Sequence, residues 1–112
     1  MGELCKAQIL FERSLPYSGP MVIARARVVF RGLVQGVYFR AHCQRRAEQL
    51  GLLGCVRNLR DGTVEAVFEG ERELIEDAIE WNVSHQPHAR VEKVDIRWET
   101  PTGEFPGFEI RQ

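Results

Sequence analysis

The chain has 112 residues, of which 44% are hydrophobic and 28% charged, and its formal net charge is −1. This length suits one folded domain, and the balance of apolar and charged residues excludes a disordered or membrane-embedded chain. Because the net charge is close to zero, we also expect no binding of nucleic acid through bulk positive charge.

The first twenty residues differ in pattern from the rest. Their apolar residues are interrupted by charged ones such as Lys6 and Glu12, so they contain neither the apolar core of a signal peptide nor a membrane-spanning stretch. Two prolines and a Ser-Gly pair near their end are typical of a linker. We therefore expect residues 1–20 to form a flexible N-terminal extension and residues 21–112 to form the compact domain.

Hydrophobic periodicity predicts the secondary structure of that domain. Alternating residues predict four strands and a short C-terminal strand, at 24–31, 52–58, 63–69, 91–98 and 105–110. Helical spacing predicts one helix from Phe39 to its stop at Gly51 and a second between Gly70 and Pro87. The strand residues expected to face the core include Val64, Ala66, Phe68, Val94, Ile96 and Trp98.

The order strand, helix, strand, strand, helix, strand is that of the ferredoxin-like α+β sandwich. We expect a four-stranded antiparallel sheet with two helices on one face and the short C-terminal strand in addition. A right-handed crossover makes the first two strands parallel, so the turn after the first strand and the end of the second lie at the same end of the sheet.

The turn after the first strand, Gly32-Leu-Val-Gln-Gly-Val-Tyr-Phe-Arg40, has features of an anion-binding segment. Its two glycines allow backbone N–H groups to converge, and the helix that follows adds the positive end of its dipole. The planar guanidinium of Arg40 can bind two phosphate oxygens. The same pattern is also typical of an ordinary glycine-containing turn followed by a solvated arginine.

Asn58 ends the second predicted strand, so the topology brings it toward Arg40. A carboxamide can orient a water molecule but cannot take its proton near neutral pH. A phosphate held by N–H groups and Arg40 beside such a residue suits hydrolysis of a phosphoryl bond with a good leaving group, such as a carboxylate. Alternatively, the amide of Asn58 caps the turn that follows it.

Three segments, 32–40, Gly54-Cys-Val-Arg-Asn58 and Asp61-Gly62-Thr-Val-Glu65, together resemble the acylphosphatase family, with a match over residues 23–111. The resemblance implies a cofactor-free enzyme that hydrolyses small acyl phosphates to a carboxylate and inorganic phosphate. It implies that Arg40 binds the phosphate and that Asn58 positions the attacking water. The phosphate-binding loop that it implies consists of Leu33, Val34, Gln35, Gly36, Val37, Tyr38, Phe39 and Arg40. Cys55 stands where many members carry Trp, so the packing around it should differ.

Two alternatives to a free-standing enzyme can be considered. Similar domains open the large carbamoyltransferases of hydrogenase maturation, so the chain could be a non-catalytic or carbamoyl-phosphate-handling module that acts with a partner protein. RNA recognition motifs share the order of elements but bind through aromatic side chains on the third strand. The outward positions of that strand here are Thr63, Glu65, Val67 and Glu69, which argues against RNA binding.

The remaining polar residues have simpler interpretations. We expect the outward arginines of the first strand, Arg25, Arg27 and Arg31, to pair with Glu65 and Glu69. The cysteines Cys5, Cys43 and Cys55 cannot all pair and form no C-x-x-C motif, so we expect free thiols in a reducing cytoplasm. His85 and His88 have no further ligand-type residues clustered nearby, so we expect no metal site. We expect a monomer that acts on a small-molecule acyl phosphate, without a membrane or nucleic-acid partner.

Overall fold

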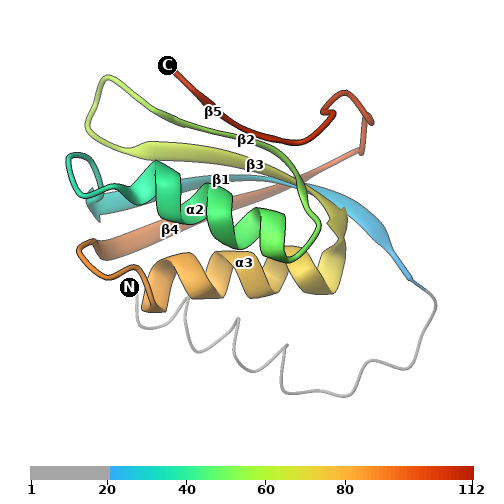
Figure 1. Cartoon of the computed structure of the whole chain (residues 1–112), viewed down its shortest axis with the longest axis horizontal. Helices are drawn as coiled ribbons and strands as arrows, with labels where there is room; N and C mark the ends of the chain where they lie inside the picture. Colours follow the sequence, from blue (N-terminus) through green and yellow to red (C-terminus); the bar gives the residue numbers. More distant parts are fainter. Residues whose placement is uncertain (1–20) are drawn as a thin grey trace.

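Strands and helices follow one another in the predicted order (Figure 1). The computed structural model describes residues 21–112, and the N-terminal extension predicted for residues 1–20 lies outside the described residues. The elements are β1 (Ile23–Leu33), α2 (Phe39–Gln49), β2 (Leu53–Asn58), β3 (Val64–Glu71), α3 (Arg72–Ser84), β4 (Arg90–Glu99) and β5 (Phe108–Arg111).

The strands form one sheet with the order β4-β1-β3-β2-β5. The four longer strands pair antiparallel, as in the predicted ferredoxin-like sandwich, and β5 extends the sheet as a fifth strand parallel to β2. Because β1 and β2 are both antiparallel to β3, they run parallel to each other. The turn after β1 and the turn after β2 therefore lie at the same end of the molecule (Figure 1).

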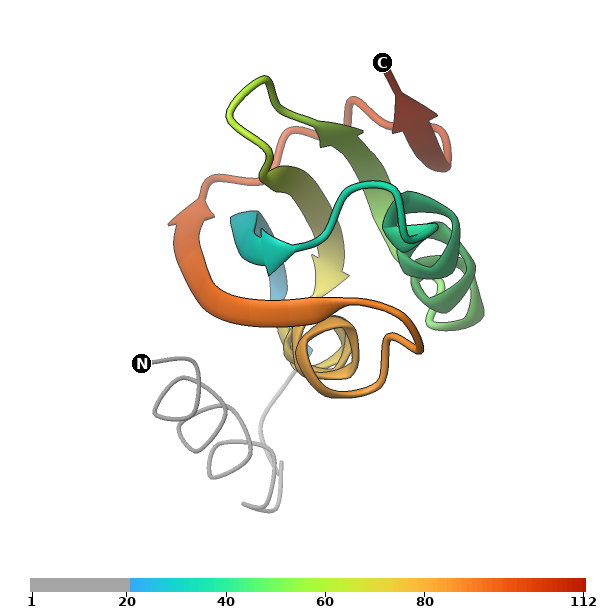
Figure 2. The same cartoon turned by 90° about the vertical axis from the view of Figure 1, so that its left-hand side faces the viewer.

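Both helices cover one face of the sheet (Figure 2). Helix α2 packs over β2 and β5, and α3 packs over β1 and β3. Burying a large apolar side chain stabilises the fold by roughly 1.5–3 kcal/mol, so the apolar faces of the strands and helices determine how the layers stack. Buried residues of this core include Ala26, Val28, Phe30, Phe39, Cys43, Ala47, Val64, Ala66, Phe68, Ile75 and Ile79.

Ile96 and Trp98 lie on the predicted core-facing side of β4, but they are only partly buried. Their exposed fractions are 37% and 36%, whereas Val94 on the same strand is 6% exposed. Both lie opposite buried residues of β1, so the predicted face is correct. However, β4 is an edge strand, and the ring of Trp98 contacts the guanidinium of Arg72, whose Cζ lies 4.2 Å from the ring centroid.

The sheet face opposite the helices is partly covered as well. Val67 and Glu69 are only 2% and 4% exposed, although the sequence predicts both to point outward. The connection from β4 to β5 covers them: Phe105 packs against Cys55 and Val67. The last strand accordingly begins at Phe108, not at the predicted Phe105.

Two of the ion pairs predicted on this face are present. Arg25 pairs with Glu69 at 3.2 Å, and Arg27 pairs with Glu65 at 3.5 Å. Arg31 instead pairs with a carboxylate of β4 at 2.7 Å. These pairs balance the positive charges of Arg25, Arg27 and Arg31 with carboxylates of β3 and β4.

Candidate active site

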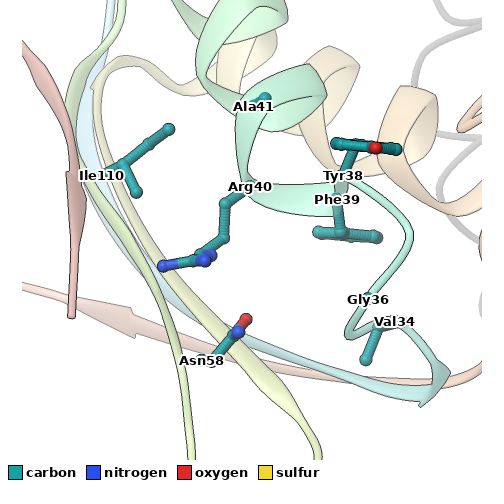
Figure 3. A pocket seen from close by; sticks show the side chains of 8 residues that line it. All are labelled: Val34, Gly36, Tyr38, Phe39, Arg40, Ala41, Asn58 and Ile110. Atoms are coloured by element: carbon teal, nitrogen blue, oxygen red, sulfur yellow. The ribbon is translucent and has the colours of Figure 1, made fainter.

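A cavity of about 420 Å³ opens at the end of the sheet where β1 and β2 terminate. Its walls come from the turn before α2, the first residues of α2, the end of β2, and β5 (Figure 3). The lining residues are Val34, Gly36, Tyr38, Phe39, Arg40, Ala41, Asn58 and Ile110. The topology thus brings Arg40 and Asn58 into one cavity, as the order of the elements predicts.

The turn that enters α2 leaves the positive end of this helix uncapped. Gly36 and Tyr38 have positive φ angles of 75° and 60°, and no side chain accepts a hydrogen bond at the helix start. The first N–H groups of a helix have no partner within the helix, and the first turn of α2 carries no acidic residue. This arrangement favours binding of an anion from the cavity.

Arg40, the second residue of α2, is half-buried and extends into the cavity between Ile110 and Asn58 (Figure 3). Its Nη1 donates a hydrogen bond of 3.3 Å to the backbone carbonyl of Arg111 on β5. Within residues 21–112 no carboxylate pairs with Arg40, whereas Arg25 is paired with three. Arg40 therefore presents positive charge that no acidic residue of the described chain neutralises.

Asn58 is the last residue of β2 and is half-buried. No described residue forms a hydrogen bond with its carboxamide. The turn after β2 is stabilised by Asp61, whose Oδ1 accepts hydrogen bonds from Thr63 N at 3.0 Å and Thr63 Oγ1 at 2.6 Å. Asn58 therefore does not cap this turn, and its carboxamide can bind a water molecule or a substrate.

Gln35 has a structural role that the sequence does not reveal. Its Nε2 donates hydrogen bonds to the backbone carbonyls of Leu59 at 2.8 Å and Thr63 at 2.9 Å. The side chain thus links the turn before α2 to the turn that directly follows Asn58. No sequence pattern could indicate this link, because its acceptors are backbone atoms that any residue supplies.

The first residues of the predicted anion-binding segment belong to β1. A Cβ atom on Gly32 would lie 2.3 Å from the carbonyl oxygen of Arg90, so this glycine permits close pairing with β4 at an irregularity of the register. The expectation that Gly32 shapes an anion-binding turn is wrong. Leu33 pairs with Arg90 in the same ladder, and Val37 packs against the core, so the side chains of both lie outside the cavity lining.

Other candidate reactive groups lie away from this cavity. Cys43 and Cys55 are buried free thiols, and burial raises the pKa of both, which disfavours reactive thiolates. The His85 ring stacks on Trp81. The part of the chain that the structure describes contains no group of three or more His, Cys, Asp or Glu placed to bind a metal ion. Neither of its helices has the length and apolar character needed to span a bilayer.

Comparison with known proteins identifies the family. The acylphosphatase family model matches residues 26–110. The chain belongs to the acylphosphatase family. An acylphosphatase from Roseiflexus sp. (strain RS-1) is 56% identical over 90 residues, which cover 80% of this chain and 97% of that protein. Members of this family are hydrolases, and the enzyme described here acts on small acyl phosphates.

Two solved structures show how far the similarity extends. An acylphosphatase from Coxiella burnetii is 36% identical, with a TM-score of 0.75, and the match covers 80% of this chain and 93% of that one. HypF from T. kodakarensis is 32% identical, with a TM-score of 0.71. That match covers 80% of this chain but only 12% of HypF, so it concerns one small part of a much larger protein.

Proposed function

We propose that this acylphosphatase holds the phosphoryl group of its substrate with Arg40 and the loop of residues 33–39, while Asn58 positions the attacking water. The observation that carries the proposal is the shared cavity. Arg40 and Asn58 meet there beside an uncapped helix start, and within residues 21–112 neither is paired with another charged or polar side chain.

Binding and charge stabilisation fall to Arg40 and the backbone. The planar guanidinium can donate two parallel hydrogen bonds to phosphoryl oxygens, and the first N–H groups of α2 can donate to the remaining oxygen. The transition state of phosphoryl transfer carries its charge on these equatorial oxygens. Fixed donors aimed at that charge lower the barrier without further reorganisation.

Asn58 acts on the nucleophile. Its side-chain oxygen can accept a hydrogen bond from a water molecule and direct the lone pair of that water toward phosphorus. The new O–P bond forms as the bond between phosphorus and the acyl oxygen breaks, and the electron pair leaves with the carboxylate. The proton lost by the water passes to a phosphate oxygen or to solvent. A carboxylate is a stable anion near neutral pH, so the leaving group needs no general acid.

Substitution of Arg40 tests the binding half of this mechanism. Arg40→Ala should lower kcat/KM for acetyl phosphate by about 10³-fold or more, the loss typical of a phosphoryl-transfer arginine. Arg40→Lys should recover little, because an ammonium group cannot reproduce the planar fork. Arg45→Ala, an exposed position on the same helix, is the matched control. Near-normal turnover in Arg40→Lys would contradict the bidentate role.

Substitution of Asn58 tests whether this residue positions the attacking water. Asn58→Ala should lower kcat by roughly 10²–10³-fold, since one preorganised polar group is lost at the reacting centre. Inhibition by inorganic phosphate should persist, because Arg40 and the backbone still bind it. Asn58→Asp should be no better than Asn58→Ala, because its carboxylate repels the phosphate. Loss of phosphate inhibition with kcat retained would make Asn58 a ligand-binding group instead.

The proposal also covers the cellular location, the oligomeric state and the start of the domain. Free Cys43 and Cys55 support a reducing cytoplasm, and the paired charges of the outer sheet face support a monomer without a nucleic-acid partner. We place the start of the domain near Met21, so a chain beginning there should melt close to the full chain. The alternative, a carbamoyl-phosphate-handling module that needs a partner protein, would be favoured if the isolated chain did not hydrolyse acetyl or benzoyl phosphate.

A further inference from the structure

Two large side chains with apolar surface are exposed at the mouth of the cavity. Tyr38 is 76% exposed and Ile110 is 40% exposed, and both line the cavity. They lie on opposite sides of Arg40 (Figure 3). The other large apolar lining residues, Val34 and Phe39, are at most 2% exposed because they pack into the core. Tyr38 and Ile110 therefore provide most of the apolar surface that a group projecting from the cavity can contact.

Local structure explains why neither side chain is buried. Tyr38 precedes α2 with a φ of 60° and a ψ of 26°, a left-handed conformation that bulky side chains seldom adopt. Residues held in such conformations are concentrated at functional sites. Ile110 shares a face of β5 with Phe108, which is 5% exposed. Ile110 itself lines the cavity beside the start of α2 and is therefore not covered by this helix.

The reaction geometry determines where the acyl group lies. In phosphoryl transfer the attacking and leaving oxygens are roughly in line with phosphorus, so the acyl group points away from the water held by Asn58. The phosphoryl group itself occupies the donors of Arg40 and of the helix start. Asn58 and these donors are polar, whereas Tyr38 and Ile110 offer apolar contacts on either side of the remaining opening.

We propose that Tyr38 and Ile110 form an acyl-binding subsite that favours acyl phosphates with an aromatic or bulky apolar acyl group. This inference rests on the proposed function, because it assumes that Arg40 fixes the phosphoryl end of the substrate. An aromatic acyl group can stack on the Tyr38 ring and pack against Ile110. An acetyl group offers only one methyl group for such contacts, so it should gain less from the subsite.

The test compares kcat/KM for benzoyl phosphate and acetyl phosphate in wild type and Ile110→Ala. Removal of a few methyl or methylene groups from an apolar pocket typically changes discrimination about 10-fold or more. We therefore expect the benzoyl-to-acetyl ratio to fall by about 10-fold in Ile110→Ala. Ile96→Ala is the matched control, since Ile96 is 37% exposed on the opposite edge strand, and it should leave the ratio unchanged.

Two further variants keep the inference testable if Ile110→Ala unfolds. Ile110→Thr keeps the β-branched shape suited to a strand, and Tyr38→Asn keeps a residue that tolerates positive φ. Both should lower the benzoyl-to-acetyl ratio. Equal losses for the two substrates, or an unchanged ratio, would overturn the inference and leave the proposed function intact. If wild type hydrolysed neither substrate, the proposed function would fail and the inference with it.

Discussion

At the scale of single residues, hydrogen bonding distinguishes side chains that stabilise a turn from side chains that remain available to bind a ligand. The turn after β2 contains several polar residues, and two side chains satisfy it: Asp61 within the turn and Gln35 from the turn before α2. Asn58, directly before the turn, is left without a partner in the described part of the chain. A carboxamide that is half-buried and unpaired is the arrangement expected of a group that binds a water molecule or a substrate.

Gln35 should therefore affect catalysis by holding the two halves of the site together. Gln35→Ala removes both hydrogen bonds to the turn after Asn58. A small misplacement of catalytic groups can lower turnover up to about 10²-fold, so we expect a loss in kcat of roughly 10- to 100-fold. Inhibition by inorganic phosphate should change much less. The groups proposed to bind phosphate belong to α2 and the turn before it, and not to the turn that Gln35 holds.

An isosteric variant separates positioning by Gln35 from simple packing. Gln35→Glu keeps the size of the side chain but replaces the donor with a carboxylate that faces two carbonyl oxygens. It should lower kcat at least as strongly as Gln35→Ala. Wild-type kcat in Gln35→Glu would show that the two hydrogen bonds do not position Asn58.

Some of these roles could be predicted from the sequence, and others could not. The side chains of Arg40 and Asn58 carry their chemistry in their residue type, and the order of elements predicts that they meet. The role of Gln35 depends on carbonyl oxygens of Leu59 and Thr63. That of Gly32 depends on the carbonyl of Arg90. The residue types of Gln35 and Gly32 do not show which backbone atoms, distant in sequence, they contact.

At the scale of elements, periodicity predicts which face of a strand a side chain occupies, but not what covers that face. Ile96 lies on the helix-facing side of β4 and is nevertheless 37% exposed, because it is on an edge strand. Val67 lies on the opposite side of β3 and is buried at 2%, because Phe105 packs on it. Coverage depends on neighbouring strands and connections, which a pattern within one strand does not contain.

Gly54 in β2 is the glycine whose replacement should damage the sheet most. It has a φ of 143°, and a Cβ atom there would lie 1.8 Å from the carbonyl oxygen of Val67 on β3. The neighbouring atom is backbone, so relief requires β2 to move away from its partner. We expect Gly54→Ala to lower the free energy of unfolding by at least about 3 kcal/mol, since a clash adds to conformational strain.

Urea unfolding with a matched glycine variant checks this prediction. Gly62 has a φ of 91°, and no atom lies within 4 Å of the Cβ that alanine would add. Gly62→Ala should therefore show conformational strain alone, about 1–2 kcal/mol. Equal stability of the two variants would mean that β2 and β3 can separate at little energetic cost.

At the scale of the whole molecule, the candidate active site and the buried ion pairs of Arg25 lie at different ends of β1. The cavity lies beyond the last residues of β1 and β2, whereas Arg25 lies near the start of β1. Arg25 is 6% exposed and contacts carboxylates of β3, β4 and the connection before β5. It therefore ties together three segments that cover the outer sheet face. We expect its loss to lower stability without altering the catalytic groups directly.

The carboxylates around Arg25 predict how stability depends on pH. Burial disfavours the charged form of Glu69, but hydrogen bonds from Thr102, Gly103 and Arg25 outweigh it, and the pKa of Glu69 lies below its usual range. Hydrogen bonds from Arg27 and Arg25 lower the pKa of Glu99. In the unfolded chain these groups titrate near the ordinary glutamate value of about 4.3. Their stabilising contribution is thus fully present above that pH and is lost as the pH falls through the lower values of the folded state.

Arg25→Met should remove the part of this pH dependence that comes from Arg25, together with the stability that it represents, while hydrogen bonds from Thr102, Gly103 and Arg27 retain the rest. Breaking a buried ion pair on one side typically lowers the free energy of unfolding by about 3–5 kcal/mol, because the remaining carboxylate stays buried without its partner. At neutral pH the variant should be less stable than wild type by about that amount. Below about pH 4 the difference should shrink, because protonated carboxyls no longer need the guanidinium.

Arg31→Met is the control. Both side chains of the Arg31–Asp95 pair are more than 40% exposed, so the loss of this pair should change stability by about 0–1 kcal/mol at any pH. Urea unfolding of the three proteins from pH 7 to pH 3 measures the effect, and a difference between wild type and Arg25→Met that stays constant over this range would show that the network does not set the acid stability.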